Sequence, residues 1–287
     1  MRSMMKTGLL FLVATGSAGY AADQDNLQYY WDFTTPPTAT TTNPVRIDPA
    51  KSVNQIGINR FVDGTNSTVY HQTGGAFGGG YIAANAANAG YNNFHVYYGM
   101  ESYINMTTGF SISMQVRNDK NASFNTSGVS FSMVFGSNDD ATFRITNNAI
   151  ALGGYTGSWT YTGAAGIVDN GASWQSVVLS VNGSGANAGI MSVYVDGNLF
   201  ATSSAAFTSR MNGGVTKFAI GGKLADNYQE TRTDASDLAF WNTALSAQDA
   251  AFLKDHAADQ LGVIPEPATA SLGLLGSLML MLRRRRS

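Results

Sequence analysis

Cysteine is absent from this 287-residue chain, which excludes disulfide bonds, thiolate metal ligands and cysteine nucleophiles. Basic residues are scarce as well. Of the 17 basic and 19 acidic residues, six basic and one acidic lie outside residues 22–264, which leaves 11 against 18 and a net charge of −7 for that segment. Nucleic-acid binding needs clustered Lys and Arg, so this class of function is disfavoured. The three histidines, His71, His95 and His256, show no metal-ligand spacing.

Lys and Glu, which favour helices, are few, whereas Gly, Ser, Thr and Asn are abundant. This composition favours short strands joined by turns over long helices. Residues 22–263 are enough for one large β-domain, whose hydrophobic core can hold without disulfides at this size.

The N-terminus has the layout of a secretory signal peptide. Arg2 and Lys6 precede an apolar run that is too short to span a bilayer, and small residues follow it. We expect residues 1–21 to be the signal peptide, with cleavage between Ala21 and Ala22. A buried N-terminal helix is the alternative interpretation.

The C-terminal segment, residues 264–287, has three parts in order. Two prolines flank an acidic residue, an uncharged apolar run follows over residues 268–282, and four arginines come next. As a helix the apolar run would reach roughly 22 Å, which is short of the ~30 Å hydrocarbon core. The arginines would keep that end on the cytoplasmic side. The residues of this signal are Pro265, Glu266, Pro267, Arg283, Arg284, Arg285 and Arg286.

This order resembles the PEP-CTERM sorting signal of Gram-negative bacteria. The resemblance implies recognition by an exosortase-type membrane enzyme, processing near the Pro-Glu-Pro motif, and a final place at the cell surface or outside the cell. Until then a short transmembrane helix would anchor the chain in the membrane. An ordinary C-terminal membrane anchor is the alternative.

Alternating apolar and polar residues predict a series of strands from about Tyr98 onward, after a loop-rich stretch that contains the glycine run 74–80. That run lacks the lysine of a phosphate-binding loop, and a flexible turn or a close backbone approach explains it better. Asp196-Gly197 predicts a type I′ hairpin, and residues 136–140 predict a turn. The predicted strands are 29–33, 110–116, 129–135, 141–146, 174–181, 190–195, 199–201, 217–220 and 236–241.

One helix is predicted near the end of the domain. Ser246 is a good N-cap, Asp249 completes a capping box, and an apolar stripe continues to Ala257. Gly262 stands where a helix commonly ends. Many short strands with a single helix predict an all-β, two-sheet antiparallel β-sandwich.

Three segments resemble laminin G-like, concanavalin A-like domains: Phe110-Ser-Ile-Ser-Met-Gln-Val116, Trp174 to Val181 together with Met191-Ser-Val-Tyr-Val-Asp-Gly197, and Ser236-Asp-Leu-Ala-Phe-Trp-Asn-Thr-Ala-Leu-Ser246. Their order matches the family, and a short helix follows the last one. The resemblance implies a jelly roll whose terminal strands pair, so that Trp31 and Trp241 should lie close together.

The same fold includes β-glucanases, whose two glutamates lie on one strand in an E-x-D-x-x-E pattern. Only Glu101 and Glu230 occur between the terminal signals, far apart and outside that pattern. The acidic pair Asp139-Asp140 fits turn caps better than catalysis. We therefore expect no enzymatic activity.

Two non-enzymatic functions remain: a carbohydrate-binding, lectin-like domain, and a purely structural matrix or adhesion component. Aromatic side chains in loops could stack on sugar rings, although core packing is an alternative for each of them. Calcium is a possible cofactor, with Asp63, Asp139, Asp226, Asp234 and Asp237 as oxygen donors without diagnostic spacing. The candidate ligand-binding residues are Tyr81, Tyr91, Tyr97, Tyr155, Trp159 and Tyr161.

Overall fold

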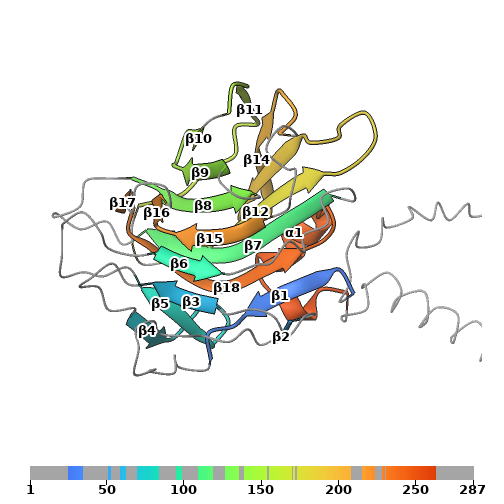
Figure 1. Cartoon of the computed structure of the whole chain (residues 1–287). Coiled ribbons are helices and arrows are strands. Elements are labelled where there is room, and N and C mark those ends of the chain that lie inside the picture. Colours follow the sequence, from blue (N-terminus) through green and yellow to red (C-terminus); the bar gives the residue numbers. More distant parts are fainter. Residues whose placement is uncertain are drawn as a thin grey trace, which may run out of the picture. The chain divides into compact units, whose positions relative to one another are not determined.

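Residues 20–264 form one compact unit whose principal elements are two antiparallel β-sheets (Figure 1). Strand after strand pairs with an antiparallel neighbour, as the alternating sequence pattern predicts. The computed structural model describes residues 25–34, 51–52, 59–62, 70–83, 95–98, 109–118, 127–135, 139–153, 155–169, 171, 173–207, 215–223, 228–229 and 231–262.

The large sheet has the strand order β11-β14-β13-β12-β7-β18-β1-β2, and the hairpin β4–β5 joins it through β18. Its strands are β1 (Leu27–Trp31), β2 (Lys51–Ser52), β4 (Tyr70–Thr73), β5 (Gly80–Ala83), β7 (Gly109–Asn118), β11 (Trp159–Tyr161), β12 (Gln175–Asn182), β13 (Met191–Val195), β14 (Asn198–Ser203) and β18 (Thr233–Trp241).

The small sheet has the order β10-β9-β8-β15, and two further strand pairs, β3–β6 and β16–β17, accompany the two sheets. The strands are β8 (Val129–Phe135), β9 (Asp139–Ile145), β10 (Ile150–Leu152), β15 (Val215–Ile220), β3 (Asn59–Val62), β6 (His95–Tyr98), β16 (Gly222–Lys223) and β17 (Tyr228–Gln229).

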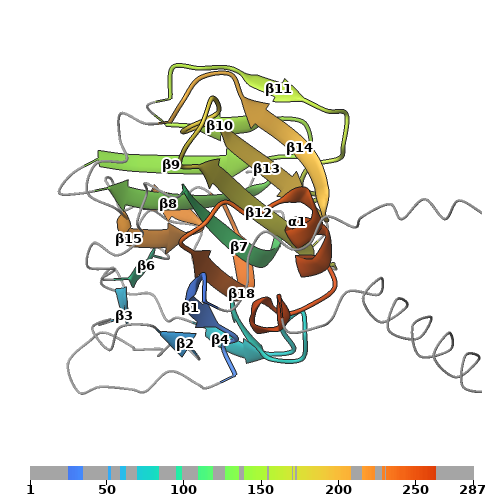
Figure 2. The same cartoon turned by 90° about the vertical axis from the view of Figure 1, so that its right-hand side faces the viewer.

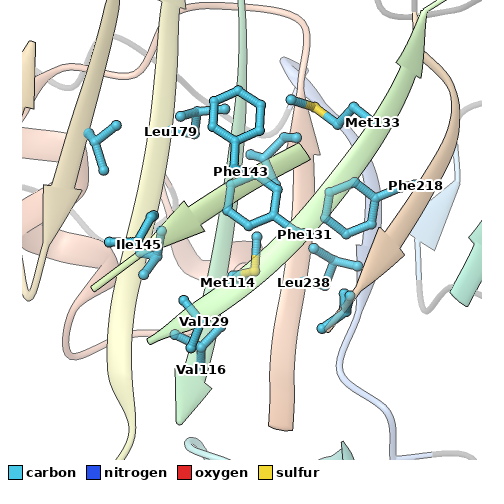
Figure 3. Packing of buried hydrophobic residues seen from close by; sticks show 14 of the residues in the cluster. Met114, Val116, Val129, Phe131, Met133, Phe143, Ile145, Leu179, Phe218 and Leu238 are labelled. Atoms are coloured by element: carbon cyan, nitrogen blue, oxygen red, sulfur yellow. The ribbon is translucent and has the colours of Figure 1, made fainter. Parts of the chain in front are cut away.

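Aliphatic and aromatic side chains together fill the space between the two sheets (Figure 3). Phe131 stacks on Phe143 within the small sheet, with ring centroids 4.9 Å apart. Phe218 of the small sheet meets Phe240 of the large sheet edge to face at 5.1 Å. All four are buried. Phe131 and Phe143 alternate with polar residues along their strands, so one face of the small sheet points toward the large sheet.

The outer face of the large sheet, which points away from this core, carries a second apolar cluster, to which the helix α1 (Ala247–Leu253) and the 3-10 helix η2 (Ala258–Gln260) contribute. Figure 2 shows α1 in front of the large sheet. The capping box predicted for Ser246 and Asp249 is present. The helix is shorter than its apolar stripe predicts, because it ends at Leu253 and the chain turns into η2 instead of continuing to Gly262.

The terminal strands β1 and β18 pair as the family resemblance implies, with Trp31 opposite Leu238 and Leu27 opposite Trp241. The two indoles nevertheless lie on opposite faces of the sheet. Trp31 belongs to the core between the sheets, whereas Trp241 belongs to the cluster under α1. Residues an odd number of positions apart along a strand face opposite sides, and Leu238 and Trp241 are such a pair.

A β-bulge interrupts the pairing of β18 with β7 between Ser236 and Ala239. Asp237, inside this bulge, has a positive φ of 51°, which Asp tolerates better than most residues. The extra residue keeps both Ala235 and Leu238 in the core and directs the Asp237 carboxylate to the outer face.

Several predicted boundaries need correction. Asp139 and Asp140 begin strand β9, where they pair with Phe135 and Val134 of β8, so the last two residues of the predicted turn 136–140 belong to a strand. The stretch before Tyr98 is not only loop, since it contains β2 to β6. The Asp196-Gly197 hairpin is confirmed by φ values of 49° and 75°.

None of the helices within the described residues has the length and apolarity needed to cross a membrane. The predicted signal peptide and the predicted C-terminal apolar helix both lie outside the described residues.

Candidate functional site

Four side chains from neighbouring strands meet at one end of the outer face of the large sheet. Arg117 of β7 lies directly opposite Asp234 of β18. Trp174 immediately precedes β12, whose Gln175 pairs with Val116, and Tyr81 lies on β5, which pairs with β18. Since three strands and the residue that precedes a fourth contribute one side chain each, the register of the sheet assembles the group. We call these residues the Arg117 row.

The guanidinium of Arg117 lies against two aromatic rings. Its Cζ atom is 4.6 Å from the ring centroid of Tyr81 and 4.7 Å from that of Trp174. The two rings meet edge to face, with centroids 5.3 Å apart and an interplanar angle of 73°. Both distances are within the range of favourable cation–π contacts. The row is therefore a box of two aromatic walls with a cation between them.

Asp234 fixes the cation in this box. Arg117 Nε donates a hydrogen bond of 2.7 Å to Asp234 Oδ2. Burial lowers the pKa of Arg117, but the hydrogen bond and the charge of Asp234 outweigh it, so the net pKa is raised. The guanidinium consequently remains charged. The side chain of Arg117 is 21% exposed and that of Asp234 only 5%, so the cation reaches solvent while its carboxylate does not.

The Arg117 row lies next to the last residue of α1, the helix that packs on the outer face of the large sheet. Gln115 Nε2 donates to the carbonyl oxygen of Leu253, the last residue of α1, at 2.8 Å. Arg117 is the next residue on the same face of β7, one step beyond that contact. Tyr81 and Trp174 are each half-buried. The helix thus leaves this end of the face accessible from the solvent.

The glycine-rich loop between β4 and β5 adjoins the row, and it is held in place by its neighbours. Gly80 N donates to Asp32 O at 3.1 Å, and Ala76 N donates to Ser236 Oγ at 3.3 Å. A Cβ on Gly75 would collide with Gly80 O and Ser236 Oγ, and one on Gly79 would collide with Asp32 O. Close backbone approach therefore explains these glycines, and a flexible turn does not.

Three predicted aromatic residues gather elsewhere, at the edge strand β11. The rings of Tyr155 and Trp159 are 5.6 Å apart, and that of Tyr161 is 5.4 Å from Phe200. Their hydroxyl groups bond the backbone: Tyr155 Oη donates to Ala205 O, and Tyr161 Oη accepts from Ile150 N. We call Tyr155, Trp159 and Tyr161 the β11 patch. Its contacts tie β11 to the neighbouring chain and to the small sheet.

The predicted aromatic residues therefore separate into two groups. Tyr81 belongs to the Arg117 row, and three others form the β11 patch. Tyr91 lies outside the described residues, and Tyr97 falls on β6, where its side chain is not described. Sequence reasoning missed Arg117 and Trp174 as site residues. The signal for Arg117 was its position after Ser111, Ser113 and Gln115 on the polar side of a predicted strand, and Trp174 stands at the start of another predicted strand.

Two of the five aspartates considered for calcium have other partners. Asp234 binds Arg117, and Asp237 accepts hydrogen bonds from Tyr30 Oη and Ala258 N. Asp139 lies on β9, whereas Asp63 and Asp226 are outside the described residues. No group of three His, Cys, Asp or Glu residues suited to a metal ion occurs in the part of the chain that the structure describes. Asp234 and Asp237 do not fit a shared calcium site.

His256 has a packing contact, as its place near the helix suggests. Its ring stacks on that of Phe252 with centroids 4.1 Å apart, and its Nδ1 lies 3.0 Å from Phe252 O. His71 and His95 lie on β4 and β6, where their side chains are not described.

No family model matches this chain. No curated protein matches it either. Solved structures do match over most of its length. A sialidase of Trypanosoma rangeli in complex with 2,3-difluoro-KDN is 16% identical, with a TM-score of 0.42, and the match covers 76% of this chain and 36% of the sialidase.

Two botulinum neurotoxin structures match in the same way. The serotype D binding domain is 12% identical with a TM-score of 0.46, covering 80% of this chain and 52% of that chain. The binding domain of neurotoxin DC in complex with SialylT is 13% identical with a TM-score of 0.44, and the match covers 80% of this chain and 51% of the neurotoxin chain. This chain thus matches only part of each structure. All three TM-scores are below 0.5, so no argument about function rests on these matches.

Proposed function

We propose that this chain is an exported bacterial cell-surface or extracellular-matrix protein whose β-sandwich binds carbohydrate at the Arg117 row. The observation that carries the proposal is the box of Tyr81 and Trp174 around the partly exposed guanidinium of Arg117. Aromatic faces offer sugar rings an apolar surface, and the guanidinium offers several N–H donors in a fixed fork for hydroxyl oxygens.

Charge favours a neutral glycan over an anionic one. The Arg117 charge is balanced by Asp234, and residues 22–264 carry a net charge of −7. A negatively charged surface repels polyanions, which also disfavours nucleic acid as a partner.

Export and sorting belong to the same proposal. The N-terminal signal and the C-terminal order of Pro-Glu-Pro, apolar run and arginines support passage through the membrane and recognition by an exosortase-type enzyme. Two packed antiparallel sheets with paired terminal strands support the concanavalin A-like jelly roll. We further propose that the domain has no catalytic activity.

The test compares the two aromatic groups. Trp174→Ala and Trp159→Ala each remove a half-buried tryptophan, the first from the Arg117 row and the second from the β11 patch. The full chain, purified in mild detergent, is applied to an array of neutral and acidic polysaccharides with calcium and with a chelator. We expect Trp174→Ala to weaken the strongest interaction roughly tenfold, whereas Trp159→Ala leaves it unchanged.

Arg117→Lys serves as a second variant, because it keeps the charge beside Asp234 and removes the planar fork. Thermal unfolding of each variant shows whether lost binding reflects lost folding. Binding lost only in Trp159→Ala would move the site to the β11 patch and contradict the proposal. Comparing the arrays with calcium and with the chelator shows whether calcium contributes to polysaccharide binding.

A structural role without a specific ligand is the second candidate function. The buried, hydroxyl-lined contacts that cover the outer face under α1 support a robust scaffold. Absence of saturable binding to every polysaccharide on the array would favour this role over the lectin-like one.

A further inference from the structure

The last described residues of the domain lie on the outer face of the large sheet. We call residues 254–262, which follow α1 and contain η2, the strap. η2 contacts β1 and β18, and the buried side chains of the strap are those of Ala258 and Leu261. All nine residues of β18 are buried, by contrast. The strap is therefore held by much less burial than the strand beneath it, and segments of this kind can open while the rest of a domain stays folded.

One carboxyl group of the sheet bonds the strap. Ala258 N donates a hydrogen bond to Asp237 Oδ2 at 3.3 Å, and Tyr30 Oη donates one to Asp237 Oδ1 at 2.6 Å. Asp237 thus joins three elements, β1, the bulge of β18 and η2. Asp237 is 5% exposed. Lifting the strap would remove the partner of Oδ2 and let water reach the carboxyl group.

The surroundings of this carboxyl group disfavour its ionised form. Burial raises the pKa of Asp237 to about 7, the hydrogen bonds from Tyr30 and Ala258 lower it, and the charges of Asp259 and Asp32 raise it. An ionised Asp237 under the closed strap is a buried charge near two like charges. The other titratable groups on these elements and their neighbours are Lys51 opposite Tyr30 on β2, Asp234 paired with Arg117, Asp249 in the capping box, and Lys254, Asp255 and His256 of the strap.

A proton on Asp237 favours the closed strap. When the strap is open, the carboxyl group meets water and ionises at the pH usual for aspartate, whereas burial under the closed strap keeps the proton to higher pH. Each opening between these two pH values releases one proton. The ratio of open to closed strap should therefore rise with pH, by up to about tenfold per pH unit, and level off once Asp237 is ionised in the closed strap as well.

We propose that the strap opens and closes with the protonation of Asp237: the protonated side chain holds residues 254–262 on the outer face, and loss of the proton releases them while the two sheets stay folded. Three residues, 262–264, separate Leu261 from Pro265 of the C-terminal signal, and release adds residues 254–261 to that connection. The added segment can extend by up to about 27 Å. This consequence for sorting rests on the proposed function, whereas the opening of the strap does not.

Hydrogen exchange of the full chain in mild detergent, followed by mass spectrometry at pH 5, 6, 7 and 8, tests the proposal. Protection is the exchange rate of an unstructured peptide at the same pH divided by the observed rate, which removes the chemical effect of pH on exchange. We expect peptides from the strap to be at least tenfold less protected than peptides from β12. Their protection should fall roughly five- to tenfold from pH 5 to pH 6, and by a smaller factor from pH 7 to pH 8.

Three variants assign the effect to Asp237. Asp237→Asn keeps an acceptor for Ala258 N without a titrating group, and asparagine tolerates the positive φ of 51° at this position. Protection of the strap in Asp237→Asn should vary less than twofold between pH 5 and pH 8. His256→Gln is the matched control, because it removes a titratable ring of the strap that stacks on Phe252, and it should keep the pH dependence of the native chain. Leu261→Ala should lower protection several-fold at every pH and keep the same pH dependence.

Several results would overturn the proposal. Equal protection of the strap and β12 at every pH would mean that the strap opens only when the domain unfolds. A pH dependence that persists in Asp237→Asn, or one that disappears in His256→Gln alone, would exclude Asp237 as the controlling group. Should Asp237→Asn fail to fold, Tyr30→Phe takes its place: it removes a bond that lowers the pKa of Asp237, so the fall in protection must continue to higher pH than in the native chain. These measurements involve neither a glycan nor a sorting enzyme, so their failure would leave the proposed function standing.

Discussion

The hydroxyl of Tyr30 donates a 2.6 Å hydrogen bond to the buried carboxylate of Asp237, joining strand β1 to the bulge of β18. Ala258 N of η2 donates to the other carboxylate oxygen at 3.3 Å. Burial raises the pKa of Asp237 from 3.8 to about 7, although both hydrogen bonds lower it. Burial and the neighbouring carboxylate also raise the pKa of Tyr30.

This raised pKa predicts a pH-dependent stability. Between pH 4 and pH 7 the folded state keeps a proton on Asp237 that the unfolded state has lost. The free energy of unfolding should therefore fall as pH rises through this window, by up to roughly 4 kcal/mol, and level off above pH 7. Urea unfolding of the native chain and of Asp237→Asn at pH 5, 6, 7 and 8 measures the difference. Asp237→Asn should lose this part of the pH dependence, since its side chain does not titrate.

Tyr30→Phe supplies the control for that experiment. The hydrogen bond from Tyr30 lowers the pKa of Asp237, so its removal should raise that pKa. The pH range over which the free energy of unfolding falls should then extend to higher pH. Identical pH profiles for the native chain and Asp237→Asn would show that this carboxyl does not titrate in the window.

Ser246→Ala should lower the free energy of unfolding by about 1 kcal/mol. The reason is the capping box, in which Asp249 N donates to Ser246 Oγ at 3.1 Å and Ser246 N donates to Asp249 Oδ2 at 2.7 Å. Ser246→Asp keeps an acceptor at the N-cap and should retain most of the stability. Denaturant titration checks both variants, and equal losses in the two would argue against the cap as the cause.

Phe218→Ala should lower the free energy of unfolding by about 3–5 kcal/mol, because it opens a cavity between the two sheets. Its ring contacts Phe131 at 5.8 Å and Phe240 at 5.1 Å. Phe77→Ala is the matched control, since it removes the same side chain from an exposed loop and should change stability by less than about 0.5 kcal/mol. A large loss in Phe77→Ala would show that this side chain packs as part of the core.

The purified chain should release no reducing sugar from laminarin. Retaining hydrolysis needs two carboxyl groups ~5 Å apart, and Glu101 and Glu230 are far apart in the sequence, outside the described residues. A pair of aspartates could replace them, with one pKa raised by burial or by its neighbour. Sugar release that a single Asp→Asn substitution abolishes would overturn the expectation, whereas saturable binding without turnover would support the lectin-like role.

The mature protein should begin near Ala22 and lack the arginine cluster when an exosortase is present. This expectation follows from the two terminal signals. Intact-mass measurement of the protein recovered from the cell surface checks both ends. A surface protein that retains Met1 or Arg283 would contradict it.

Local sequence patterns determined the elements of this fold. Alternation of apolar and polar residues predicted the strand at residues 129–135 with the bounds that the structure has, and the longest strand, β7, to within two residues. Asp196-Gly197 predicted the hairpin, and Ser246 with Asp249 predicted the helix start. Each of these signals depends on neighbours in the chain, so it can be read without knowing the fold.

The short strands β10 and β11 carry no such signal. Each has three residues, too few for an alternating pattern, and tertiary contacts such as the bond from Ile150 N to Tyr161 Oη hold them in place. The helix was predicted too long for a related reason. Its apolar stripe continues past Leu253, but the chain then turns into η2. That turn brings Ala258 and Leu261 into the apolar cluster on the outer face.

The sequence predicted the candidate site only in part. Tyr81 was among the aromatic residues proposed to stack on sugar rings, but its neighbours in the Arg117 row were not predicted. Arg117, Trp174 and Asp234 meet Tyr81 because the registers of four strands bring residues from distant parts of the sequence to one end of a sheet. The bulge at Asp237 and the approach of Gly79 to Asp32 likewise depend on which strands become neighbours. Periodicity along the chain specifies which face a residue occupies, whereas contacts between strands require the pairing that only the folded sheet decides.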